Sequence, residues 1–68
     1  MPIITFESGQ LAPETKAALI ERLTDVAVEV TGIPKHLFFV SLHILPDDEI
    51  AVGGKSVAEL KRDLAAKS

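Results

Sequence analysis

The sequence predicts one small α/β (α+β) domain, residues 1–68, built on a β-α-β unit with a parallel two-stranded sheet. A short C-terminal hairpin arm and a short C-terminal helix complete the predicted fold. Two strand-like runs flank a segment of helical period, and a Gly-Gly pair follows the second run. Sixty-eight residues suffice for a single domain. A crossover of this length favours parallel strands with a right-handed connection.

The first element is a strand over residues 2–7, with Ile4 and Phe6 on one face and the odd-numbered residues on the other. Many chains begin with Met-Pro, but the pair also has a chemical meaning. Methionine is normally removed before a small residue, which would leave Pro2 as a secondary amine able to accept a proton. If Met1 stays, the Pro2 nitrogen belongs to a tertiary amide without basicity.

A helix is expected from Pro13 to about Thr31. Pro13 suits the first turn, because its missing N–H would have no partner there, and Gly32 suits the end of the helix. An apolar stripe at helical spacing is expected to face the core: Leu19, Ile20, Leu23, Val26, Ala27 and Val30. An acidic row on another face could hold a cation but is expected to be solvated: Glu21, Asp25 and Glu29.

The second strand is expected over residues 37–45. Its even-numbered residues, 38 to 44, are all apolar and should face the helix. The opposite face mixes apolar residues with Ser41 and His43, and a single helix cannot cover both faces. This second face therefore requires another subunit. In a parallel sheet the two strands start side by side, so Pro2 should lie near residues 37–39.

A polar turn over residues 46–49 leads into residues 50–54, which are expected to form a short strand or hairpin arm. The glycine pair Gly53-Gly54 lacks the spacing of a phosphate-binding loop. Instead, Ser56 with Glu59 three residues later forms a capping box, and a helix should follow to about Ala66.

Composition excludes several classes of function. Without cysteines there are no disulfides or thiolate zinc sites, and the two histidines, His36 and His43, are a poor basis for a metal site. A net charge of −3 without a basic stripe argues against nucleic-acid binding. No run approaches the ~20 apolar residues of a membrane span, so a cytoplasmic location is expected by elimination.

The hydrophobic content is high for so short a chain. Forty-seven per cent of the residues are hydrophobic, yet the core of a domain this small rarely contributes more than ~3–5 kcal/mol. More apolar side chains than one small core can use indicate self-association. We therefore expect a homo-oligomer, from dimer to hexamer, with no metal and no cofactor.

Taken in order, these features resemble the 4-oxalocrotonate tautomerase family over nearly the whole chain. The matching residues are Pro2 and Ile3, Lys16 and Leu19-Ile20, Pro34, and the run from Ala51 to Ser56. The resemblance implies a tautomerase-like, oligomeric β-α-β subunit, commonly a trimer of dimers. It also implies that an amino-terminal proline moves a proton between an oxygen and a carbon of an enol. Other members use the protonated proline in hydration, dehalogenation or decarboxylation.

Three positions depart from the pattern of the best-known members. The turn after the first strand, residues 8–11, lacks the arginine that holds a substrate carboxylate, and Phe39 replaces a second arginine. Ile50 replaces an aromatic residue before the glycine pair. Of four characteristic active-site positions, only Pro2 is kept. A dicarboxylate is therefore an unlikely substrate, because no guanidinium clamps are present at these positions.

The predicted catalytic residue is Pro2, and the predicted substrate-binding residues are Phe39, Ile50, His43 and Lys35. An exposed α-amino group titrates near pH ~7.7–8.0, and apolar burial lowers that value by disfavouring the cation. His43 could donate a hydrogen bond to substrate, or lie hydrogen-bonded in a subunit interface. Lys35 could place positive charge at the pocket edge, or be an ordinary solvated lysine.

The sequence thus predicts a cofactor-independent tautomerase acting on a small, apolar or monocarboxylic enol. One alternative is a tautomerase-fold subunit without tautomerase activity, structural or regulatory, either by itself or in a hetero-oligomer. Another is a proline-dependent hydratase, dehalogenase or decarboxylase. A third is a small ligand-binding oligomer that uses the Phe39 face as an apolar pocket.

Overall fold

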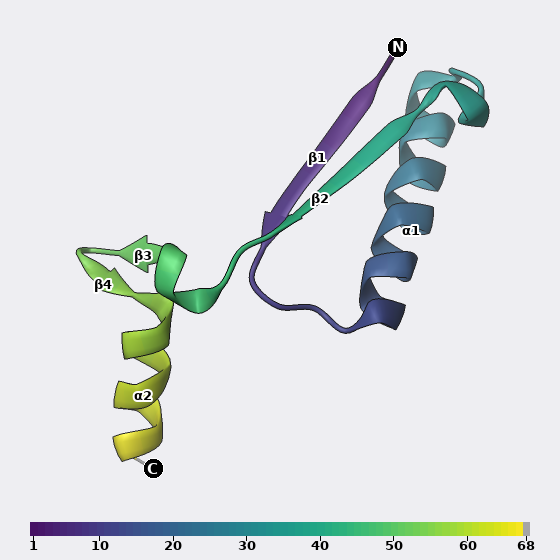
Figure 1. The fold of residues 1–68 in the computed structure, drawn as a ribbon. Helices are drawn as coiled ribbons and strands as arrows, with labels where there is room; N and C mark the ends of the chain where they lie inside the picture. The colour runs from purple at the N-terminus through teal and green to yellow at the C-terminus, as the bar shows by residue number, and fades with distance from the viewer. Residues whose placement is uncertain (68) are drawn as a thin grey trace.

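Two parallel strands, β1 (Ile3–Ser8) and β2 (Phe39–Ile44), form the centre of the molecule (Figure 1). The computed structural model describes residues 1–67. Helix α1 (Pro13–Thr31) connects the strands and lies beside them. Ile3 pairs with Phe39 at one end of the sheet, and Ser8 pairs with Ile44 at the other. The predicted β-α-β unit with parallel strands is confirmed.

The strand limits differ slightly from those predicted. β1 begins at Ile3 and includes Ser8, one position later than expected at both ends. A 3₁₀ turn, η1 (Lys35–Leu37), forms before β2, so the second strand is shorter than the predicted residues 37–45. Leu45 lies beyond β2, but its N–H still donates to the Ser8 carbonyl at 2.9 Å. The backbone pairing therefore extends one residue past the assigned strand.

The limits of α1 match the prediction. Pro13 occupies the first turn, followed by Glu14 at the positive end of the helix dipole. At the other end Gly32 takes a left-handed conformation, with φ of 73°, which glycine adopts without a steric penalty. The Gly32 N–H donates to the Val28 carbonyl at 2.8 Å and closes the helix.

The prediction that the whole apolar stripe of α1 faces the core is wrong for one protomer. Among the described residues, the side chain of Thr24 is the one that is buried, at 9% exposure, and its hydroxyl donates to the Ile20 carbonyl at 2.6 Å. Three members of the predicted stripe remain exposed, namely Ile20 at 44%, Val26 at 58% and Val30 at 79% exposure. The apolar stripe and the sheet-facing side of α1 therefore overlap only in part within one protomer.

The sheet has two different faces. The even-numbered residues of both strands are half-buried on the side of α1, as predicted. The opposite side, here called the open face, consists of Ile3, Thr5 and Glu7 of β1 with Phe39, Ser41 and His43 of β2. No element of residues 1–67 covers the open face, where Ile3 is 65% and Phe39 is 52% exposed.

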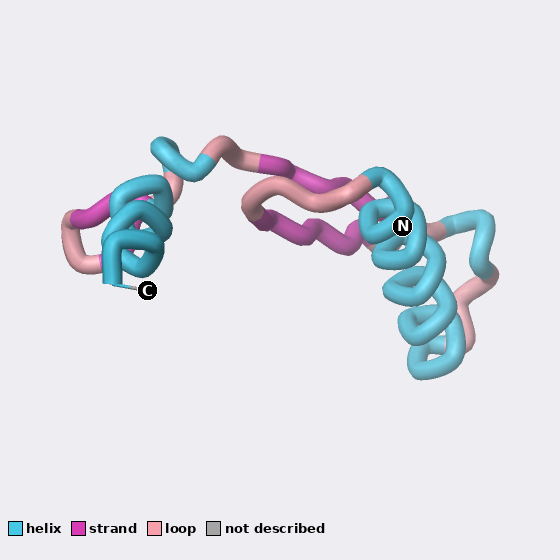
Figure 2. Tube along the Cα trace, turned by 90° about the horizontal axis from the view of Figure 1, so that it is seen from below, coloured by secondary structure: helices cyan, strands magenta, loops and turns pink. Residues whose placement is uncertain are grey.

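The C-terminal arm extends away from the β-α-β unit (Figure 2). It contains the 3₁₀ turn η2 (Asp47–Glu49), strands β3 (Ala51–Val52) and β4 (Lys55–Ser56), and helix α2 (Val57–Lys67). β3 and β4 form the predicted hairpin, with both connecting glycines at positive φ. The first half of the predicted capping box is also present, because the Glu59 N–H donates to Ser56 Oγ at 3.1 Å.

A large part of the surface of this protomer is apolar and open. Its radius of gyration is 16.1 Å, whereas a compact chain of this length has about 11 Å. Its accessible area of 5180 Å² exceeds the roughly 4,200 Å² expected for a compact monomer of this mass. The excess of about 1,000 Å² accompanies an extended shape, with principal extents of 48 × 23 × 17 Å. Neither helix of the described residues is long and apolar enough to cross a membrane.

Candidate functional site

A backbone hydrogen bond holds Pro2 at the end of the sheet where both strands begin. The Phe39 N–H donates to the Pro2 carbonyl at 3.0 Å, which places Pro2 beside the start of β2. This confirms the expectation that parallel pairing brings Pro2 to residues 37–39. Pro2 is half-buried, whereas Met1 before it is 84% exposed. Removal of Met1 would therefore take no packed side chain from the fold.

The residues that adjoin Pro2 in the strand register are apolar. Ile3 and Phe39 are neighbours in the sheet register, and both lie on the open face. Leu37, at the end of η1, is 43% exposed at the same end of the sheet. Phe39 is thus brought to Pro2 as predicted. These residues offer a ligand an apolar surface rather than a pair of charged side chains.

Lys35 lies in η1, just before β2, and its ammonium is engaged in an ion pair. Lys35 Nζ lies 3.1 Å from Asp25 Oδ1 of α1, and both side chains are more than half exposed. An exposed ion pair of this kind contributes little to stability. It does neutralise part of the charge that Lys35 was predicted to offer. The pair also engages one member of the predicted acidic row.

His43 lies on the open face, farther along β2 than Phe39. Its Nε2 is 2.9 Å from Ser41 Oγ, a hydrogen bond between residues i and i+2 on the same strand. Four residues of strand separate His43 from Phe39, roughly 13 Å at 3.3 Å per residue. The structure therefore does not bring His43 to the Pro2 of its own chain.

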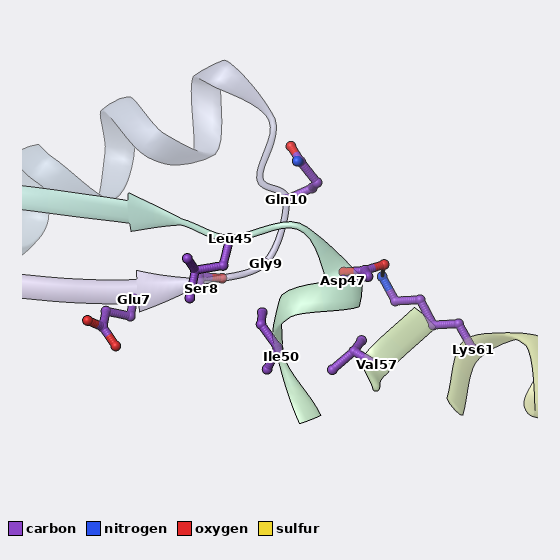
Figure 3. Close-up of a pocket in the computed structure, with 9 residues that line it drawn as sticks. All are labelled: Glu7, Ser8, Gly9, Gln10, Leu45, Asp47, Ile50, Val57 and Lys61. Atoms are coloured by element: carbon purple, nitrogen blue, oxygen red, sulfur yellow. Dashed lines mark hydrogen bonds and ion pairs between the residues drawn. The ribbon is translucent and has the colours of Figure 1, made fainter. Parts of the chain in front are cut away.

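Ile50 lies at the other end of the sheet, in a pocket of about 460 Å³ (Figure 3). The pocket is where the carboxyl end of β1 and the residues after β2 meet η2 and α2, and its lining is Glu7, Ser8, Gly9, Gln10, Leu45, Asp47, Ile50, Val57 and Lys61. Six residues of strand separate Pro2 from Ser8, about 20 Å. Within one chain, Ile50 cannot contact a substrate held at Pro2.

An ion pair closes one side of this pocket. Lys61 Nζ of α2 donates to Asp47 Oδ2 at 2.8 Å, and Asp47 is the more buried partner. Ile50 and Val57 line the same pocket and lie below this pair in the view of Figure 3. The Val57 N–H donates to the Ile50 carbonyl at 2.7 Å, which ties α2 to the end of η2. The pair therefore anchors the C-terminal arm rather than presenting a free cation.

Sequence reasoning missed two of these contacts. Ser41 precedes His43 by two residues on one strand face, a spacing that could have indicated their hydrogen bond. The Lys61–Asp47 pair joins residues 14 apart across two turns, and no periodic pattern indicates it. Within residues 1–67 no three His, Cys, Asp or Glu side chains are grouped as metal ligands.

The comparisons with known proteins extend over the same elements. A family model described as a tautomerase enzyme matches residues 2–60. The matched region begins at Pro2, includes both strands of the sheet, α1 and the hairpin, and ends within α2. No curated protein sequence matches the chain at a significant level.

Several solved structures are similar to the chain over nearly their whole length. A 4-oxalocrotonate tautomerase isozyme from Methylibium petroleiphilum is 30% identical, with a TM-score of 0.82, covering 87% of this chain and 97% of that chain. TomN, a 4-oxalocrotonate tautomerase homologue in the tomaymycin biosynthetic pathway, is 37% identical, with a TM-score of 0.76 and coverage of 88% and 91%. A heterohexamer 4-oxalocrotonate tautomerase from Chloroflexus aurantiacus is 30% identical, with a TM-score of 0.72 and coverage of 87% and 94%.

Proposed function

Because this chain belongs to the tautomerase family, we propose that it is a tautomerase-like enzyme whose general base is the amine of Pro2. Removal of Met1 creates that amine. The observation that carries the proposal is the position of Pro2, half-buried and hydrogen-bonded through its carbonyl to the Phe39 N–H at the end of the sheet where Ile3 and Phe39 pair. An apolar setting disfavours the ammonium form, so the nitrogen is available as a base near neutral pH.

The proposed reaction moves one proton between two atoms of the substrate. The neutral Pro2 nitrogen takes the proton of an enol hydroxyl and becomes an ammonium. It then returns a proton to the carbon of the enol double bond that does not carry the oxygen. That carbon becomes saturated as the oxygen-bearing carbon forms a carbonyl. No cofactor or metal takes part in this proposal.

The proposed substrate is a small enol with an apolar body and at most one carboxylate. Ile3, Leu37 and Phe39 provide an apolar surface beside Pro2, and Lys35 is paired with Asp25. Binding two carboxylates would require further cations to offset their desolvation. His43 and Ile50 lie too far along the sheet to contact a substrate at the Pro2 of the same chain. A role in the site would require them to come from another copy.

The intact mass of the purified protein tests the first requirement. We expect a mass that lacks one methionine residue, since proline is small enough for the usual removal of Met1. A chain that keeps Met1 quantitatively has no basic nitrogen at Pro2, and the proposed mechanism then fails. Such a result would favour a tautomerase-fold subunit without activity.

We also propose that the protein is a homo-oligomer, between dimer and hexamer. No hydrophobic side chain of residues 1–67 is buried in the protomer, although apolar residues are abundant. Sedimentation velocity at micromolar concentration should therefore show dimers or larger species. A well-folded monomer as the main species would contradict this expectation.

A further inference from the structure

The segment between α1 and β2 leads directly to the group that holds Pro2. It comprises residues 32–38 and includes the turn η1. The next residue is Phe39, whose N–H donates to the Pro2 carbonyl at 3.0 Å. This hydrogen bond lies at the end of the strand register, where Ile3 pairs with Phe39. A displacement of residues 32–38 is therefore passed to Pro2 through a single backbone contact.

Two backbone hydrogen bonds shape this segment from within. The Leu37 N–H donates to the Pro34 carbonyl at 3.0 Å, and the Phe38 N–H donates to the Lys35 carbonyl at 3.2 Å. These bonds close the 3₁₀ turn, but both partners of each bond belong to the segment. The orientation of the turn relative to the helix and the sheet must therefore come from other contacts.

The Lys35–Asp25 ion pair provides such a contact. Lys35 Nζ of η1 lies 3.1 Å from Asp25 Oδ1 of α1. Asp25 precedes the last residue of α1, Thr31, by about 9 Å along the helix axis, at 1.5 Å per residue. The pair therefore attaches η1 to the side of the helix, in addition to the covalent connection at the helix end.

A continuous series of contacts thus leads from α1 to Pro2. The Asp25 carboxylate binds the ammonium of Lys35, and the Lys35 carbonyl accepts the hydrogen bond of residue 38. Residue 39 then donates to the Pro2 carbonyl. The other two ion pairs found within residues 1–67 lie in the C-terminal arm. The Lys35 pair is accordingly the ionic contact that acts on the Pro2 end of the sheet.

We propose that Lys35 is a positioning residue, whose ion pair with Asp25 holds η1 in place and thereby fixes Pro2 relative to a substrate. A general base must lie within hydrogen-bonding reach of the proton that it removes, so a small displacement of Pro2 lowers the rate. The effect on catalysis rests on the proposed function. The effect on the hydrogen bond between Phe39 and Pro2 does not.

Amide hydrogen exchange, measured residue by residue by NMR, tests the attachment without reference to activity. In Lys35→Gln the Phe39 amide should exchange roughly two- to fivefold faster, the size of effect expected for an exposed ion pair. The Leu45 amide, which donates to the Ser8 carbonyl at the other end of the sheet, should keep its rate. A general loss of stability would instead accelerate both amides.

Exchanging the two charges provides a second variant. Lys35→Gln and Asp25→Asn each remove the ion pair, whereas Lys35→Asp combined with Asp25→Lys restores one with the charges reversed. The double variant should return the exchange rate of the Phe39 amide towards that of the unmodified chain. Glu21→Gln is the matched control, because it removes an exposed carboxylate one turn before Asp25 and should leave that rate unchanged.

The ionic strength provides a test on the unmodified chain. Both side chains of the pair are more than half exposed, so added salt screens their attraction. Raising the salt concentration should accelerate exchange of the Phe39 amide in the unmodified chain and have no such effect in Lys35→Gln. The same salt response in both proteins would contradict the proposal.

The kinetic consequence should appear in kcat rather than in KM. Lys35→Gln should lower kcat for an enol by roughly two- to tenfold, less than the ~10²-fold that a displacement of about 1 Å can cost. KM should stay the same, because no contact with substrate is lost. A raised KM with unchanged kcat would mean that Lys35 binds the substrate directly, and it would overturn the positioning role.

The two proposals fail in different ways. Equal exchange of the Phe39 amide in the unmodified chain and in Lys35→Gln would overturn the role of Lys35, whatever the activity. An active enzyme whose kcat is unaffected by Lys35→Gln would overturn it as well. Acceleration confined to the Phe39 amide, in a chain without ketonisation activity, would instead refute the proposed enzyme and leave the attachment of η1 intact.

Discussion

Replacing Pro2 with alanine is expected to lower kcat/KM for ketonisation of an enol such as phenylenolpyruvate by roughly 10²-fold or more, the usual contribution of a general base. The backbone contact at this position is made by the carbonyl of residue 2, which alanine retains. The fold and the hydrogen bond to Phe39 should therefore survive. Alanine loses the ring that fixes the nitrogen next to the substrate and turns a secondary amine into a primary one.

Loss of the enol absorbance measures this rate. The matched control is the unmodified sequence produced with Met1 uncleaved, because it keeps every side chain but converts the amine into an amide. It should be at least as inactive as Pro2→Ala. Full activity in either protein would exclude Pro2 as the base. For the mature protein, kcat/KM should rise with pH and level off once the amine is neutral, near or below pH ~7.7–8.0.

Replacing Phe39 with arginine is expected to reverse the substrate preference. The backbone N–H of residue 39 is hydrogen-bonded to the Pro2 carbonyl, and Phe39 is 52% exposed. A guanidinium can therefore be placed there without crowding a packed core. A bidentate guanidinium–carboxylate contact is among the stronger polar contacts in proteins. We expect kcat/KM for a dicarboxylic enol such as 2-hydroxymuconate to rise by roughly tenfold or more, in line with a charge-assisted hydrogen bond.

The same substitution should lower activity on an enol without a carboxylate, because part of the apolar surface beside Pro2 is lost. Phe39→Leu is the control, since it keeps an apolar side chain and adds no charge. It should leave the preference between the two substrates unchanged in direction. Equal responses of both substrates to Phe39→Arg would mean that this side chain does not contact the substrate.

Sequence reasoning located α1 and the hairpin well because local chemistry sets their limits. Pro13 and Gly32 mark the two ends of a helix in ways that few other residues can, and Ser56 with Glu59 marks the start of α2. The limits of β2 were less certain, because residues 35–37 form a 3₁₀ turn that apolar alternation does not distinguish from strand.

The positions of candidate site residues could be predicted from the sequence to different extents. Parallel pairing determines which residue lies beside Pro2, so the position of Phe39 could be read from topology alone. Ile50 was selected from a resemblance at the level of sequence, which does not state whether residues belong to one chain or to several. The apolar stripe of α1 illustrates the same limit. Periodicity identifies an apolar face such as that of Val26 and Val30, but not which molecule covers it.

The hydrogen bond between Pro2 and Phe39 also has a consequence during synthesis. The first strand has no partner until a further 37 residues have been added. At the usual 5–20 residues per second, this takes roughly two to seven seconds. During that interval the first strand has no sheet partner. The sheet, and with it the hydrogen bond that holds Pro2 beside Phe39, can therefore form only after β2 has been synthesised.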